Sequence, residues 1–364
     1  MKKDDWVLSH VGLMVKDWDI PMGYYQSTEI GVSVGPQIIH HDFAEMYAGP
    51  FNVFLNNQVP LLSGGSGVEN NSEENTSIDP TEKNPSLNLA FDTLEQVNDV
   101  LMGGVQGGVA PSTYHFMDKD CQVRNLLLEV IQDKSLPLEG ITHLCYSVPD
   151  PVAETKKLID KGCEVSFSLT HDGSVLENYV DTRQHGNVVI SFRPSMPELE
   201  KKWTAHNRAH PMVSDWQFHG LGIVVRDLDK TVAYYESLEI ADFQPETQFD
   251  SGSVEAIDEA GSVADVDIQS RTRTAMIGKV AFEFVQPLEG KVIYGESLDK
   301  MGEGVCDMAF TVANLEQEIK KLSQKGIEIA FAGKSKSGPA FAYFDTREQN
   351  GNVMIRLIQR TLTN

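Results

Sequence analysis

The segment that decides the fold is residues 179–190, which read YVDTRQHGNVVI. A closely similar segment, YFDTREQNGNVMI, occupies residues 343–355. A glycine lies 19 residues before the aspartate in both copies, as Gly162 and as Gly326. Because both the residues and their spacing agree, the sequence indicates an internal duplication.

A second pair of matching segments precedes the first pair. Residues 12–17 read GLMVKD and correspond to residues 222–227, which read GIVVRD. A Tyr-Tyr pair follows each of them, beginning at Tyr24 and at Tyr234. The chain is therefore predicted to hold four modules, A (6–132), B (140–193), A′ (216–286) and B′ (304–360).

Each module reads as a strand, a helix and then several strands. Asp150 and Pro151 predict a helix start in module B, and Gly162 predicts its end. Asn314 and Gly326 play the same parts in module B′. The Asp-Thr-Arg and Gly-Asn segments are typical of turns between strands. We therefore expect an α/β (α+β) protein with four βαβββ modules, paired into two open eight-stranded cups.

The length of 364 residues exceeds what a single hydrophobic core usually organises, so two domains are expected. The first is predicted at residues 1–193 and the second at residues 216–364. The segment 194–215 holds three prolines and several charges, which favours a linker.

Module A carries an insertion at about residues 56–120. Its part from Ser63 to Pro85 is rich in Gly, Asn, Ser and Glu, a composition that predicts the least ordered part of the chain. Two later parts of the insertion resemble an extra strand and an extra helix, at 87–91 and 94–102.

Composition excludes several classes of function. The chain has 30 Lys and Arg against 53 Asp and Glu, a net charge of −23, which repels nucleic acid. No run of residues is apolar for long enough to span a membrane, and no signal-peptide core follows Met1. The 4 cysteines lack paired spacing, as expected of reduced thiols. We expect a cytoplasmic protein, a monomer or a homodimer, that binds a small molecule.

Four such modules, with a Gly-Asn turn before the last strand of each half, resemble the vicinal oxygen chelate superfamily. This group includes glyoxalases, bleomycin resistance proteins and extradiol dioxygenases. Residues 219–229, HGLGIVVRDLD, look most similar to the methylmalonyl-CoA epimerase branch. The resemblance covers nearly the whole chain except the insertion and the linker, and it implies the fold more strongly than the reaction.

The resemblance also implies a metal site in the first half. Family ligands come from the first and last strands of each module, and the matching positions are His10, Glu129 and His143, with Ser191 where the family usually has a carboxylate. Two histidines and one carboxylate suit one divalent ion, which could be Fe, Mn, Co, Ni or Zn. An open coordination position would let the metal act as a Lewis acid on a substrate that chelates it through two oxygens.

The matching positions in the second half do not form such a set. The position of His10 is taken by Gly220, and His219 is one residue out of register, which turns a strand side chain to the opposite face. The position of Ser191 is taken by Arg356, a cation that opposes metal binding. We therefore expect no metal there and an ion pair from Arg356 to Glu283 or Asp307.

Further residues are candidates for substrate contacts and for proton transfer. The substrate-binding candidates, which share a strand face with the metal positions, are Ser191, Arg193 and Cys145. The candidates for a general base are Glu45, Glu177 and Tyr179, with His40 and His41 as further alternatives.

Three functions remain open at this point. The first is a metal-assisted isomerase or lyase that removes a proton beside a carbonyl group. The second is an iron-dependent extradiol-type dioxygenase, although in that class the glutamate comes from the last strand of the active pair, and here it comes from module A. The third is a non-catalytic small-ligand-binding protein related to bleomycin resistance proteins.

Overall fold

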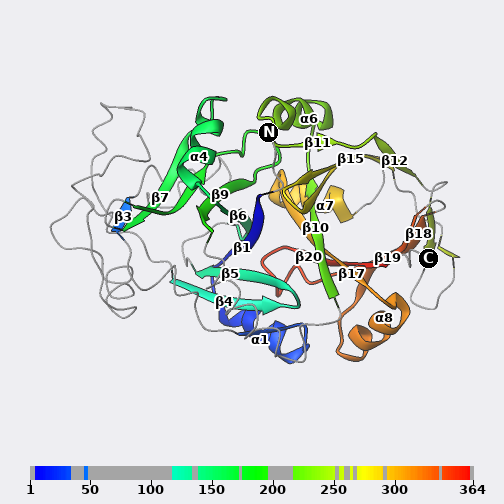
Figure 1. The fold of residues 1–364 in the computed structure, drawn as a ribbon. Helices are drawn as coiled ribbons and strands as arrows, with labels where there is room; N and C mark the ends of the chain where they lie inside the picture. The colour runs from blue at the N-terminus through cyan, green and yellow to red at the C-terminus, as the bar shows by residue number, and fades with distance from the viewer. Residues whose placement is uncertain are drawn as a thin grey trace.

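A computed structural model shows two large curved β-sheets that lie side by side (Figure 1). The structure describes residues 5–33, 45–47, 117–132, 138–171, 174–195, 216–250, 254–257, 263–264, 269–289, 293–335 and 338–360. The predicted linker and nearly all of the insertion, with its less ordered part and its extra strand and helix, lie outside these residues. None of the described helices has the length and hydropathy that a membrane span requires.

The first sheet has nine strands in the order β2-β4-β5-β1-β6-β9-β8-β7-β3. Its elements in chain order are β1 (Val7–Val15), α1 (Asp19–Ser27), β2 (Gly31–Ser33), β3 (Glu45–Tyr47), β4 (Met117–Val123), β5 (Leu126–Gln132), β6 (Gly140–Val148), α4 (Pro151–Ile159), β7 (Val165–His171), β8 (Ser174–Val180) and β9 (Val189–Pro194).

The second sheet has eleven strands in the order β11-β15-β16-β10-β17-β20-β19-β18-β13-β14, with β12 also paired to β15. Its elements are β10 (Trp216–Val224), α6 (Leu228–Ser237), β11 (Asp242–Phe243), β12 (Thr247–Asp250), β13 (Val254–Ile257), β14 (Val263–Ala264), β15 (Gln269–Ile277), β16 (Val280–Glu289), α7 (Ile293–Met301), β17 (Gly304–Val312), α8 (Leu315–Gln324), β18 (Ile329–Ser335), β19 (Ala340–Phe344) and β20 (Met354–Gln359).

The expected number of eight strands in each sheet was wrong. In the first sheet, β3 adds a ninth strand by pairing with β7 at the edge. In the second sheet, β13 pairs with β18 and β14 pairs with β13, which extends one edge. At the other edge, β11 and β12 both pair with β15 and together take the place of one strand. The physical reason is that an open sheet leaves unpaired backbone groups at its edges, and nearby chain segments satisfy them.

The helix ends follow the predicted capping residues. The Asp150 side chain accepts a hydrogen bond from the Ala153 backbone N–H at 2.9 Å at the start of α4. Asn314 caps α8 in the same way at 3.0 Å. Gly162 and Gly326 follow the two helices with φ of +93° and +78°, a left-handed conformation that favours glycine.

The alternation of side chains along the strands divides each sheet into two faces. Leu128 and Val130 of β5 are buried in the main core beneath the helices. Glu129 lies between them in the sequence, so its side chain points to the opposite, concave face. In β16 the same alternation sends Phe284 to the core and Glu283 to the concave face. The concave faces therefore collect the polar residues.

Two equivalent ion pairs join the two halves, each between a lysine of one half and a glutamate of the other. Lys161 pairs with Glu239, and the equivalent Lys325 pairs with Glu29 at 2.9 Å. The main buried core cluster includes residues of both halves. The joint is therefore a packed interface, and it relates the two halves in a nearly symmetric way.

Candidate functional site

Strand register brings three of the predicted residues to one place on the concave face of the first sheet. Gly12, near the middle of β1, is paired with Glu129 on β5 and with His143 on β6. His10 lies two residues before Gly12 and therefore shares its face. β1 therefore carries one possible ligand residue, His10, and each of its two neighbouring strands carries another.

The donor atoms of these side chains face one another. His143 Nε2 lies 3.2 Å from Glu129 Oε2 and 3.3 Å from His10 Nε2. His10 Nε2 lies 3.5 Å from the same Glu129 oxygen. The exposed fractions are 1% for His10, 5% for Glu129 and 0% for His143. The three atoms form a small, buried triangle of nitrogen and oxygen.

The glycine at position 12 makes room for this arrangement. A Cβ atom at Gly12 would lie 1.9 Å from Cε1 of the His143 ring. The imidazole therefore lies directly over the backbone of the neighbouring strand. Gly222 makes room for Asp307 in the same way, with 1.8 Å to a carboxylate oxygen.

Two hydroxyl groups that the sequence analysis did not single out hold the outer sides of the histidine rings. Ser9 and Thr142 are each the extra residue of a one-residue β-bulge, on β1 and β6 respectively. Ser9 Oγ lies 3.2 Å from His10 Nδ1, and Thr142 Oγ1 lies 3.1 Å from His143 Nδ1. The signal that could have found them is a hydroxyl residue directly before each histidine.

A second carboxylate, that of Glu177 on β8, also points to this site. Ser191 on β9 donates a hydrogen bond to Glu177 Oε1 at 2.7 Å, and the same oxygen lies 3.9 Å from His10 Nε2. Cys145 joins His10 and Glu177 in a second group of possible ligand atoms within 4.8 Å of one another. The carboxylate that position 191 lacks is thus supplied from the neighbouring strand.

The remaining sequence candidates take different places. The Tyr179 ring lies edge-on to His143, with centroids 5.0 Å apart. Arg193 is buried and its Nε donates to Ser147 Oγ at 3.0 Å. Glu45 lies on β3 at the sheet edge, two strands beyond β8, and its side chain is outside the described residues, as are His40 and His41.

Burial controls the protonation of the groups around the site. It lowers the pKa of His143 to about 4, although the negative charge of Glu177 acts in the opposite direction. Burial raises the pKa of the Cys145 thiol and of the Tyr179 phenol well above their usual values, and the charge of Glu177 adds to both shifts. Near neutral pH, His143 is therefore a neutral imidazole, and the thiol and phenol keep their protons.

The donor set fits a divalent cation. Ligands at about 2.0–2.2 Å from one ion lie about 2.8–3.6 Å apart in tetrahedral or octahedral geometry, and the observed separations are 3.2, 3.3 and 3.5 Å. Two imidazoles and a carboxylate are also the ligand types that Fe, Mn, Co, Ni and Zn accept. His10, Glu129 and His143 would hold such an ion.

The equivalent place in the second sheet holds a cation supplied by the protein itself. Arg356 Nε lies 2.9 Å from Asp307 Oδ1, and Arg356 Nη1 donates to Glu283 Oε1. The expected ion pair is therefore present, and it includes both acidic residues. Burial raises the pKa of Asp307 to about 6, while the charge of Arg356 acts to lower it.

Helix α7 covers this second place. Its Tyr294 hydroxyl lies 2.5 Å from the hydroxyl of Tyr343, which accepts a hydrogen bond from Arg356 Nη1 at 3.1 Å. Tyr294 also belongs to a small apolar cluster with residues of the concave face, Val224, Val285, Cys306, Tyr343 and Met354. The second cup is thus filled by a helix of its own chain.

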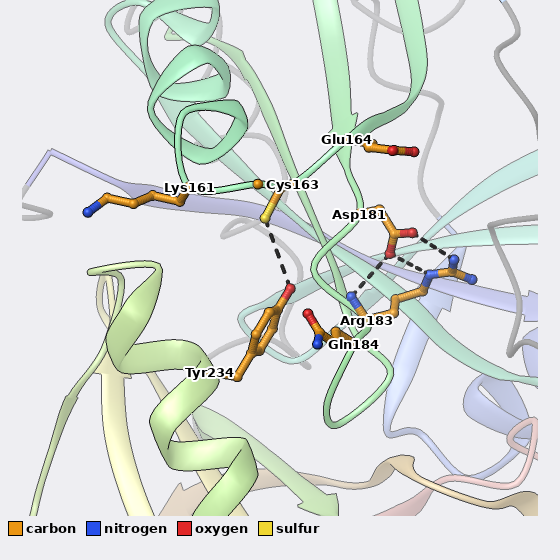
Figure 2. A pocket seen from close by; sticks show the side chains of 8 residues that line it. Lys161, Cys163, Glu164, Asp181, Arg183, Gln184 and Tyr234 are labelled. Carbon is orange, nitrogen blue, oxygen red and sulfur yellow. Dashed lines mark hydrogen bonds and ion pairs between the residues drawn. The ribbon is translucent and has the colours of Figure 1, made fainter. Parts of the chain in front are cut away.

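A separate polar pocket of about 230 Å³ lies where the two halves meet (Figure 2). It is lined by Lys161, Gly162, Cys163, Glu164, Asp181, Arg183, Gln184 and Tyr234. Arg183 pairs with Asp181 at 2.8 Å, and Lys161 pairs with Glu239 from the other half. Because these charges are paired within the protein, the pocket gives no specific indication of a ligand.

Comparison with known proteins supports the fold. Residues 219–344 match the family model described as the Glyoxalase/Bleomycin resistance protein/Dioxygenase superfamily. The structure is similar to that of a mutant 4-hydroxymandelate synthase from Streptomyces coelicolor, with a TM-score of 0.58 and 11% identity over 98% of this chain and 93% of that chain. At this identity the likeness concerns the fold alone.

Shorter structures match part of the chain. Methylmalonyl-CoA epimerase from Mycobacterium tuberculosis has a TM-score of 0.32 and 17% identity over 40% of this chain and 88% of that chain. A hypothetical protein from Bacillus halodurans has a TM-score of 0.33 and 14% identity over 41% and 97%. No curated protein sequence matches the chain.

Proposed function

We propose that the first sheet, which repeats the arrangement of the half that matches the glyoxalase, bleomycin resistance and dioxygenase family model, holds one divalent metal ion on His10, Glu129 and His143. We further propose that the protein is a metal-assisted isomerase or lyase. Its substrate would be a small molecule that offers a pair of carbonyl or carboxylate oxygens. The observation that carries the proposal is the convergence of the three donor atoms within 3.2–3.5 Å of one another.

The difference between the two halves supports this assignment. The register-matched places hold His10 against Gly220 and Ser191 against Arg356. In the second sheet a guanidinium group pairs with Asp307 and Glu283. In the first sheet that position carries a neutral hydroxyl, while the two buried carboxylates Glu129 and Glu177 remain. A divalent cation bound there would place its positive charge beside both carboxylates.

The second carboxylate favours proton transfer as the reaction. A bound divalent ion supplies Lewis acidity, which makes a proton beside a chelated carbonyl easier to remove. Glu177 is not needed to complete a two-histidine, one-carboxylate set, and Ser191 orients it by donating to Oε1. We assign Glu177 the role of the general base, which accepts the proton from carbon and returns it to the isomerised product.

Metal analysis of the protein, purified without a chelator or a metal-affinity resin, tests the metal site. We expect about one ion per chain in the wild type and none in His143→Ala, because one of three ligands is lost. The matched control is Asp307→Ala, the equivalent position in the second sheet, which should keep the wild-type metal content. Metal retained in His143→Ala, or lost in Asp307→Ala only, would place the ion elsewhere.

The identity of the metal and a second variant test the reaction class. Glu177→Gln should keep the metal but lose exchange of the substrate's carbon-bound hydrogen with deuterated solvent, measured on a panel of 2-oxo and thioester acids. Iron(II) with oxygen-dependent inactivation would instead favour the dioxygenase, since two histidines and one carboxylate are also the ligands of non-haem iron oxygenases. Wild-type protein that binds no metal would favour the small-ligand-binding protein.

A further inference from the structure

The hydroxyl group of Thr142 lies between two polar atoms. Its Oγ1 lies 3.4 Å from the carbonyl oxygen of Gly12 and 3.1 Å from Nδ1 of His143. A carbonyl oxygen can only accept a hydrogen bond, so a hydrogen bond between these two oxygens uses the single hydroxyl hydrogen of Thr142. The hydroxyl oxygen is then left as an acceptor toward His143.

The direction of this hydrogen bond decides which ring nitrogen of His143 carries the hydrogen. When the Thr142 hydroxyl hydrogen is directed to Gly12, His143 Nδ1 donates to Thr142 Oγ1 and Nε2 keeps a lone pair. That lone pair is directed toward Glu129 Oε2 at 3.2 Å and His10 Nε2 at 3.3 Å. With the opposite tautomer, an Nε2–H group would donate to Glu129 and occupy the place of the cation.

We propose that Thr142 is a positioning residue, which fixes the Nδ1–H tautomer of His143 and thereby keeps Nε2 available as a metal ligand. This inference rests on the metal site proposed above. The β-bulge is the structural device: it inserts Thr142 as an unpaired residue opposite the step from Gly12 to Leu13, and so directs its side chain to the ring of the next residue. Metal-bound histidines commonly need such a partner on the second nitrogen.

Ser9 makes the corresponding contact to His10 at the other bulge, with 3.2 Å between Oγ and Nδ1. The second half supplies a natural control. Its bulge residue Cys306 donates from Sγ to the Gly222 carbonyl at 3.4 Å, as Thr142 does to Gly12. Its next residue is Asp307, which has no tautomer to fix. The bulge is therefore shared by both halves, and the histidine partner belongs to the first half.

The experiment compares Thr142→Val, which removes the hydroxyl but keeps the shape, with Thr142→Ser, which restores it. Long-range ¹⁵N–¹H NMR spectra of metal-free, histidine-labelled protein report the tautomer, and a His143→Gln variant identifies the His143 signals. We expect the Nδ1–H form in the wild type and in Thr142→Ser, and the Nε2–H form in Thr142→Val. Thr142→Ala serves as a second hydroxyl-free variant if the valine variant does not fold.

Titration with Zn²⁺ or Mn²⁺ alone gives the second readout. The affinity should fall by about 10–100-fold in Thr142→Val and recover in Thr142→Ser, while Cys306→Ala leaves it unchanged. An Nε2–H signal in the wild type, or an unchanged tautomer and affinity in Thr142→Val, overturns the inference. A wild type that binds neither ion refutes the metal site, while the NMR spectra of the metal-free protein still decide the role of Thr142.

Discussion

At the scale of single residues, the first site depends on the missing side chain of Gly12 as well as on the side chains of its possible ligands. Gly12 has no side chain, and the His143 ring occupies the space where one would be. The donors on the two neighbouring strands can therefore approach one another across β1. Glycine is required here by a close approach of a side chain, and not by an unusual backbone conformation.

Replacing Gly12 with alanine should displace His143. The added Cβ atom would lie 1.9 Å from the ring, so the imidazole must move away from its ligand position. We expect metal affinity to fall at least tenfold, as with loss of a ligand partner, and the free energy of unfolding to fall by about 1–3 kcal/mol because of overpacking.

The control for this prediction is Gly140→Ala on β6, where the nearest atom to an added Cβ atom is 3.8 Å away. Isothermal titration with a divalent ion and urea denaturation measure the two effects. Wild-type metal affinity in Gly12→Ala would show that His143 is not a ligand.

At the scale of elements, the last strand of each half decides what the concave face can do. β9 and β20 occupy equivalent positions in their sheets, and each pairs in parallel with the first strand of its second module. β9 presents Ser191 and β20 presents Arg356. The strands beside β9 and β20 also differ. β8 carries Glu177, and the residue at the equivalent position of β19 is Phe341. The second face therefore carries a guanidinium group and a phenyl ring where the first carries a hydroxyl group and a carboxylate.

Replacing Arg356 with serine, the residue at the equivalent place in the first sheet, should destabilise the second half. It leaves Glu283 and the fully buried Asp307 without their cation. Removal of one partner of a buried ion pair costs about 3–5 kcal/mol. Urea denaturation should show this loss.

The control is Arg271→Ala, which breaks pairs to Asp229 and Glu246 at the surface. This change should cost less than about 1 kcal/mol, because exposed ion pairs are weak. Equal losses in the two variants would mean that the Arg356 network contributes no more than a surface pair.

At the scale of the whole molecule, one buried group on each concave face responds to pH, and the two groups respond in opposite directions. The pKa of His143 is lowered to about 4 from an ordinary value of 6.5, chiefly by burial. The unfolded chain then binds this proton more readily, so its contribution to stability is complete above about pH 6.5 and is lost as the pH falls toward 4. The pKa of Asp307 is raised to about 6 from 3.8, so its contribution increases as the pH falls through the same range.

Variants of the metal-free protein should separate these two effects. Relative to the wild type, the unfolding free energy of His143→Gln should rise by about 3 kcal/mol between pH 6.5 and pH 4, because the wild type alone must protonate a buried imidazole. That of Asp307→Asn should fall by a similar amount. Urea denaturation at several pH values, with a chelator present, gives both numbers, and parallel pH profiles in all three proteins would refute the argument.

The amino-acid sequence by itself determined the helix caps and the faces of the site residues on their strands, because each depends on a local pattern, whereas the division into four modules and two domains stays a prediction. Asp150 and Asn314 cap the helices that their sequences predict. The match of Gly12 with Gly222 placed His143 and Asp307 at equivalent positions, and both pair with those glycines. The oligomeric state stays a prediction.

Only the tertiary structure decided which distant side chains complete the site. Glu177 was one weak candidate among several, and its role became visible once β8 lay beside β9 and Ser191 reached its carboxylate. The hydroxyl of Thr142 reaches His143 through a bulge that strand alternation does not reveal. The alternation of residues along a strand predicts which face of the sheet a side chain occupies. The neighbours on that face depend on strand order and on bulges, which are set by contacts between residues far apart in the chain.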